Sequence, residues 1–110
     1  MSQSPTQGIK YDQDKLRYDL LPPHALQMVV EVFTFGATKY GDRNWELGMD
    51  WARLFGAMSR HTWAWFKGET NDPETGNNHL AHAVCCLLML LEYTHSGKGK
   101  DNRPYTQGGT

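Results

Sequence analysis

Apolar residues recur at helical spacing in three stretches of the chain, separated by Gly-rich breaks. These stretches cover residues 22–40, 51–66 and 77–94. No segment alternates between apolar and polar residues for long enough to indicate a strand. The pattern therefore predicts an all-α fold, a small helical bundle.

Local residue chemistry marks the expected ends of these helices. Pro22 and Pro23 suit a helix start, because the amide hydrogen that proline lacks would be unpaired there. Gly41 should end the first helix, Asp50 is the expected N-cap of the second, and Gly68 should stop it.

The third stretch differs from the other two, because after its first turn it is apolar on nearly every face. Such a helix needs cover on all sides, so we expect it at the centre of the bundle. Three helices of this length bury little surface by themselves. We therefore expect a homo-oligomer, either a homodimer or a homotetramer.

The two ends of the chain have a different composition from the middle. Residues 1–8 and 97–110 are rich in Ser, Gln, Gly, Thr and Pro and hold almost no large aliphatic side chain. Such segments bury too little surface to offset the entropy lost on ordering. We expect flexible tails there, flanking one domain at residues 9–96, although a phosphate or a neighbouring subunit could order the second tail.

Charge and hydropathy exclude several classes of protein. Eleven Lys and Arg against twelve Asp and Glu give a net charge of −1, so neither duplex nucleic acid nor an anionic membrane is an expected partner. The longest apolar run, residues 83–91, falls well short of the ~18 residues that a membrane span needs. No secretory signal opens the chain, and Cys85 and Cys86 are neighbours that cannot bridge the fold. A cytoplasmic protein is expected.

Imidazoles and carboxylates gather between the second and third stretches. His79 and His82 lie three residues apart, so their rings project from one side of a helix. Glu69, Asp72 and Glu74 come shortly before them. Carboxylates and imidazoles without a thiolate suit Mg²⁺ or Mn²⁺ better than a structural zinc ion. Alternatively, these side chains only cap the helix and bond locally.

His61 lies near the apolar side of the second stretch, with Arg60 beside it. In an antiparallel helix pair it could approach His79 and His82 from across the groove. A lone histidine there also fits an ordinary core position. The chain has no H-E-x-x-H motif and no adjacent His-Asp pair, which speaks against a zinc metalloprotease and an HD-type phosphohydrolase.

Basic and aromatic side chains without an obvious packing role occur elsewhere. Lys15 and Lys39 provide the charge that a polyphosphate requires. Asn44 and Trp45 offer an amide and a stacking surface to a nucleobase. The alternative is a solvated rim with an aromatic residue that anchors a loop.

Residues 8–93 resemble the phage-encoded dATP/dGTP diphosphohydrolases, which belong to the MazG-like nucleotide pyrophosphatases. The motifs that carry the resemblance are Lys10-Tyr11-Asp12, Lys15, Asp19-Leu20-Leu21-Pro22, residues 35–41, Asn44-Trp45, Arg60-His61, Gly68-Glu69, residues 72–76 and residues 79–83. The E-E-x-x-E motif of the broader MazG superfamily is absent. His61 and the pair of His79 and His82 could stand in for some of its ligands.

The resemblance implies a MazG-type fold and hydrolysis of a purine deoxynucleoside triphosphate to the monophosphate and pyrophosphate. It implies two or three Mg²⁺ or Mn²⁺ ions, held by some of Glu69, Asp72, Glu74, His79 and His82. The implied catalytic residues are His61, Glu69 and Asp72.

The resemblance also suggests how the substrate binds. Lys15, Lys39 and Arg60 would contact the phosphates, and Asn44 and Trp45 would contact the purine. We expect dGTP as the first substrate and dATP as the second, with dGMP supplied for 2-aminoadenine nucleotides and the protein in the host cytoplasm. The competing interpretation is a non-enzymatic helical adaptor or a nucleotide-binding protein.

Overall fold

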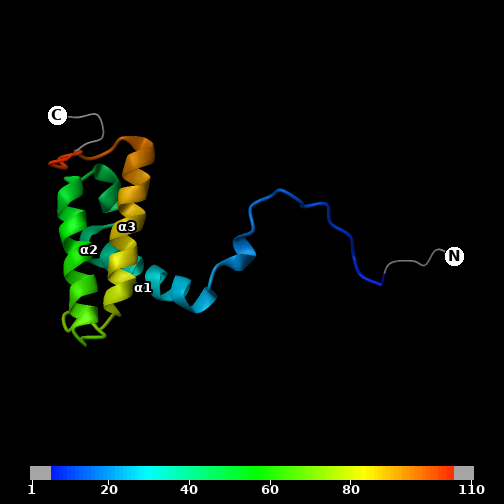
Figure 1. The fold of residues 1–110 in the computed structure, drawn as a ribbon, viewed down its shortest axis with the longest axis horizontal. Helices are drawn as coiled ribbons and strands as arrows, with labels where there is room; N and C mark the ends of the chain where they lie inside the picture. The colour runs from blue at the N-terminus through cyan, green and yellow to red at the C-terminus, as the bar shows by residue number, and fades with distance from the viewer. Residues whose placement is uncertain (1–5, 106–110) are drawn as a thin grey trace.

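The structure, a computed structural model, describes residues 6–105, whose regular elements are all helices. Three long helices, α1 (Pro23–Tyr40), α2 (Trp51–Phe66) and α3 (His79–Ser96), form a small bundle (Figure 1). Two short 3-10 helices, η1 (Tyr18–Leu20) and η2 (Asn44–Leu47), precede α1 and α2. The predicted all-α bundle is confirmed.

The helix ends follow from local chemistry, with one exception. Gly41 ends α1 with a φ of 98°, and its N–H donates to the carbonyl of Ala37 at 2.8 Å. Asp50 precedes α2 as expected, but its side chain makes no cap hydrogen bond. The N–H of Ala52, in the first turn of α2, has no acceptor within the helix and donates to Oδ1 of Asn102 at 2.9 Å. A residue far along the chain therefore provides this cap.

The third helix lies at the centre, as its apolar composition predicted. It packs along α2 and also contacts α1, and both neighbours are visible beside it in Figure 1. Val29 and Val32 of α1 pack against Cys85, whereas Leu54 of α2 packs against Tyr93. These two small clusters form the core of the single chain.

The segment after α3 lies against the start of α2. Trp51 donates its backbone N–H to the carbonyl of Lys100 and its ring Nε1 to the carbonyl of Lys98, both at 2.9 Å. The N–H of Lys100 donates to the carbonyl of Met49 at 3.2 Å. The tail expected from residue 97 is therefore attached to the bundle over residues 98–102. Backbone hydrogen bonds hold it, which composition does not reveal.

The other expected tail, residues 1–8, lies mostly outside the described residues, which exclude residues 1–5. Residues 106–110 of the second expected tail also lie outside them. Residues 6–17 extend away from the helices (Figure 1). Among the described helices, none combines the length and the apolar character that crossing a membrane requires.

Candidate functional site

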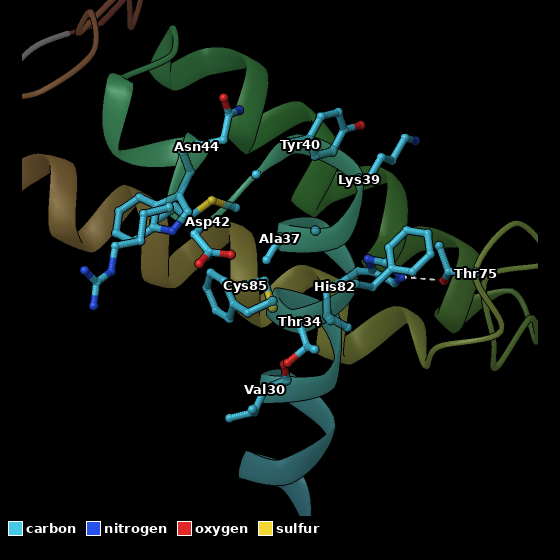
Figure 2. A pocket seen from close by; sticks show the side chains of 18 of the residues that line it. Val30, Thr34, Ala37, Lys39, Tyr40, Asp42, Asn44, Thr75, His82 and Cys85 are labelled. Carbon is cyan, nitrogen blue, oxygen red and sulfur yellow. Dashed lines mark hydrogen bonds between the residues drawn. The ribbon is translucent and has the colours of Figure 1, made fainter.

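A cleft of about 990 Å³ lies over one side of α3, between α1 and α2 (Figure 2). His82, Cys85 and Met89 of α3 contribute to its floor. The end of α1 and the loop that follows line one wall, and residues of α2 and of the loop before α3 line the rest. Every long helix therefore contributes to the cleft.

Three potential metal ligands converge at one end of this cleft. His61 comes from α2, Asp72 from the loop before α3, and His82 from the first turn of α3. One ligand atom of each lies within 4.8 Å of the others, and all three residues are half-buried. The rings of His61 and His82 are stacked, with centroids 4.5 Å apart and planes 8° apart.

Burial favours the neutral form of the imidazoles of His61 and His82. The pKa of His61 is lowered by burial and, to a lesser extent, by the neighbouring His82. Burial also lowers the pKa of His82, although the carboxylate of Asp72 opposes that shift. A neutral imidazole carries the lone pair that a metal ion requires.

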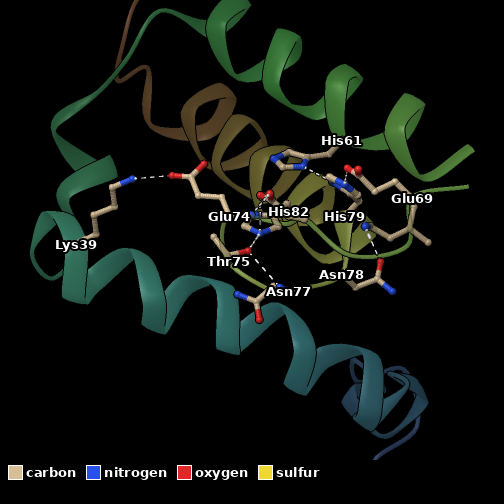
Figure 3. Close-up of polar contacts among 11 residues, drawn as sticks. Lys39, His61, Glu69, Glu74, Thr75, Asn77, Asn78, His79 and His82 are labelled. Atoms are coloured by element: carbon tan, nitrogen blue, oxygen red, sulfur yellow. Dashed lines mark hydrogen bonds and ion pairs between the residues drawn. The ribbon is translucent and has the colours of Figure 1, made fainter. Parts of the chain in front are cut away.

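His61, His79 and Glu69 form a chain of hydrogen bonds, with His79 in the middle (Figure 3). The carboxylate of Glu69 accepts from Nε2 of the buried His79 at 2.6 Å. This places the proton of a neutral His79 on Nε2, so its Nδ1 accepts from Nδ1 of His61 at 2.8 Å. Nε2 of His61 is then left with its lone pair. Metal-binding histidines are oriented in this way by a partner on the other ring nitrogen.

The loop before α3 is shaped by its own hydrogen bonds. Oδ1 of Asp72 accepts from the N–H of Glu74 at 2.9 Å, which leaves Oδ2 at 3.6 Å from Nε2 of His82. The hydroxyl of Thr75 accepts from the N–H of Asn77 and donates to Nε2 of His82 at 2.8 Å. An ion bound at that nitrogen would replace the bond from Thr75.

Glu74 pairs with a side chain that the sequence did not suggest. Its Oε1 lies 3.6 Å from Nζ of Lys39, an ion pair that joins the loop to the end of α1 (Figure 3). Proximity to Tyr40 and Glu74 raises the pKa of Lys39. Glu74 therefore faces the cleft from outside the group of His61, Asp72 and His82.

Most of the residues singled out from the sequence meet at the cleft, but not all. Those that line it are Lys39, Asn44, Trp45, His61, Asp72, Glu74 and His82. Glu69 and His79 are connected to it through His61. Lys15 lies on the extended N-terminal segment and Arg60 is exposed on α2, and neither lines the cleft. The phosphate contacts expected of these two residues stay predictions.

Trp45 has a structural contact as well as a place in the cleft. Its ring lies 6.4 Å from that of Phe33 and 6.1 Å from that of Tyr93, measured between centroids. Its carbonyl accepts a hydrogen bond from the hydroxyl of Tyr93. Trp45 therefore anchors the loop before α2, and it also lines the cleft.

The sequence analysis assigned no role to Arg53, which also lines the cleft. It precedes His61 on α2 by eight residues, and the positions 53, 57 and 61 follow one side of a helix. That spacing was the feature of the sequence that could have placed Arg53 on the same side of the helix as His61. The cleft thus has imidazoles and a carboxylate at one end, and Arg53, Asn44 and Trp45 among its other lining residues.

Together, the fold and the cleft define a small helical-bundle protein with a candidate divalent-metal site. The chain belongs to the dATP/dGTP diphosphohydrolase family, because residues 5–103 match the family profile described as "dATP/dGTP diphosphohydrolase, N-terminal". This confirms the resemblance noted in the sequence.

One curated relative is similar over most of the chain. The protein is 34% identical over 99 residues, 90% of its length, to the dATP/dGTP diphosphohydrolase of Salmonella phage PMBT28. It spans only 34% of that relative, about a third of its length. No solved structure matches the chain.

Proposed function

We propose that this chain is a metal-dependent nucleotide pyrophosphohydrolase that converts dGTP, and secondarily dATP, to the monophosphate and pyrophosphate. The observation that carries the proposal is the convergence of His61, Asp72 and His82 within 4.8 Å at one end of a large cleft. The names of the family and of the phage relative support this choice of reaction and substrate. The dGMP formed would supply 2-aminoadenine nucleotide synthesis in a phage.

The chemistry of the three side chains fits a divalent transition-metal ion. Mg²⁺ prefers oxygen ligands, whereas imidazole nitrogen together with carboxylate oxygen also suits Mn²⁺. We therefore favour Mn²⁺ over Mg²⁺, held by His61, Asp72 and His82. When bound, such an ion would polarise a phosphate group of the substrate and would lower the pKa of a bound water molecule. Two or three ions per site stay a prediction, since these three residues suffice for one.

The other residues of the site would position the substrate and the ligands. Lys39 and Arg53 carry the positive charge that a triphosphate needs, and Lys39 would exchange its pairing with Glu74 for a phosphate. Asn44 and Trp45 would contact the purine. Glu69 would act through His79 as a positioning residue that keeps Nε2 of His61 unprotonated.

The direct test is the identity of the products. Incubation with dGTP and Mn²⁺ should yield dGMP and pyrophosphate in equal amounts, and EDTA should abolish the reaction. Anion-exchange chromatography of the nucleotides and an enzymatic pyrophosphate assay measure both products. Inorganic phosphate with dGDP would reject attack at the α-phosphate. Binding of dGTP without any product would instead support the nucleotide-binding protein.

Lys39 offers a test of phosphate binding. Lys39→Ala should raise KM for dGTP about tenfold to a hundredfold, as expected for the loss of one charge-assisted contact. The pair with Glu74 is exposed, so thermal stability should change little. Lys67→Ala is the matched control, because Lys67 is exposed at the end of α2 and does not line the cleft. Equal KM values in the two variants would place Lys39 on a solvated rim.

A further inference from the structure

The segment before α1, residues 6–22, is called the arm here. It carries large apolar side chains that belong to neither of the two core clusters. Their exposed fractions are 64% for Ile9, 88% for Tyr11, 80% for Leu16, 75% for Tyr18, 69% for Leu20 and 51% for Leu21. Figure 1 shows the arm directed away from the helices. Leaving so much apolar surface in water is unfavourable by about 25 cal/mol for each Å². The arm therefore needs a partner.

The arm also has local structure of its own. The N–H of Lys15 donates to the carbonyl of Asp12 at 3.2 Å, and η1 follows shortly after. Arg17 binds both carboxylate oxygens of Asp19 at 2.8 Å. The family profile matches from residue 5 onward, so the matched range includes the arm. A partly preformed segment loses less entropy when it binds.

A second apolar surface is uncovered on the side of α3 away from the cleft. Its members come from the end of α2 and from α3 and carry no charge: Trp63, Phe66, Leu80, Val84, Leu87 and Leu91. Their exposed fractions lie between 37% and 72%. The four positions on α3 follow one side of the helix. We call this set the outer surface, and a hollow of about 380 Å³ lies at its end by Trp63, Phe66 and Leu80.

The arm of the same chain is poorly placed to cover the outer surface. It joins α1, which packs on another side of α3 through Ala81 and Cys85. The first residues of α1, positions 23–27, are all exposed, so the helix carries the arm beyond the bundle before the arm begins. Pro22 and Pro23 at the junction restrict a reversal of direction there.

We propose that the arm of one copy lies on the outer surface of a second copy, so that two chains exchange arms in a symmetric dimer. One contact then covers two apolar features that the single chain leaves exposed. In a two-fold arrangement both arms and both outer surfaces are used, so the assembly closes after two chains. The proposal does not depend on the proposed hydrolysis, so its tests measure mass and proximity rather than activity.

The first test removes apolar contacts from the arm. Leu16→Ser combined with Leu20→Ser should raise the dimer dissociation constant at least a hundredfold, about tenfold or more for each leucine withdrawn from an interface. Light scattering over a concentration series should show a dimer for the unmodified chain and a monomer for the variant. Both leucines are exposed in the single chain, so circular dichroism should be unchanged.

Leu47→Ser is the matched control, because Leu47 is 84% exposed on η2 and belongs to neither surface. It should leave the dimer intact. A monomeric unmodified chain would overturn the proposal. A dimer that survives the loss of Leu16 and Leu20 would also overturn it, since the outer surfaces would then meet each other directly.

The second test locates the arm. Tyr18 is replaced by photoreactive benzoylphenylalanine, and equal amounts of ¹⁵N-labelled and unlabelled chains are mixed in urea, refolded together so that mixed dimers form, irradiated and digested. Arm exchange predicts crosslinked peptide pairs of mixed isotope composition that join the arm to residues 62–66 or 80–91. Pairs of one isotope only would show an arm folded on its own chain. Mixed pairs that end elsewhere on the partner would reject the outer surface as the receiving site.

Discussion

Replacing Asp72 with asparagine should nearly abolish turnover of dGTP and weaken Mn²⁺ binding at least tenfold, with little change in folding. Asparagine keeps an oxygen that can accept from the N–H of Glu74, so the loop retains its hydrogen bond. It loses the negative charge that faces His82 and that a cation would need. Stability without metal should fall by no more than the ~1 kcal/mol that a capping group contributes.

Calorimetric titration with Mn²⁺ and a turnover assay on the same preparation measure both effects. Asp50→Asn is the matched control. Asp50 is an exposed residue next to the start of α2, and its carboxylate makes no cap hydrogen bond. His82→Ala should reproduce the loss from a second ligand. If both site variants bind Mn²⁺ and hydrolyse dGTP as the unmodified chain does, the ligand assignment is wrong. The search would then move to Glu31 and Glu92.

Replacing Tyr93 with alanine should lower the free energy of unfolding by about 3–5 kcal/mol, the cost of deleting a buried aromatic ring. Tyr93 is fully buried and packs against Leu54 and the ring of Trp45. Tyr93→Phe keeps the ring and deletes the hydroxyl that donates to the Trp45 carbonyl. That variant should lose only about 0.5–1.5 kcal/mol, the net contribution of one hydrogen bond, because the Trp45 carbonyl still accepts from the N–H of Gly48.

Urea denaturation of the two variants separates packing from hydrogen bonding. In a chain of this size, each kcal/mol lowers Tm by about 4–8 °C. Tyr105→Phe serves as the control, since Tyr105 is 87% exposed and should lose almost nothing. Equal stability of Tyr93→Phe and the unmodified chain would show that the loop of Trp45 is held by the ring contacts alone.

The candidate site was only partly predictable from the sequence. The approach of His61 to His79 and His82 follows from an antiparallel helix pair, and the structure brings these three rings together. The partners of Glu69 and Glu74 do not follow, because loop side chains take directions that their surroundings select. Glu69 turned to His79 and Glu74 to Lys39, whereas sequence proximity alone had grouped both with Asp72.

The sequence by itself determined where the helices lie, because apolar spacing and the proline and glycine signals are local properties. It also indicated that α3 contacts both other long helices, since a helix apolar on nearly every side packs against several neighbours. The tertiary structure decided which polar groups meet. Asn102 rather than Asp50 caps α2, and Glu74 forms an ion pair with Lys39. Those contacts join residues far apart in the chain, so they arise only when the helices pack, and no local pattern encodes them.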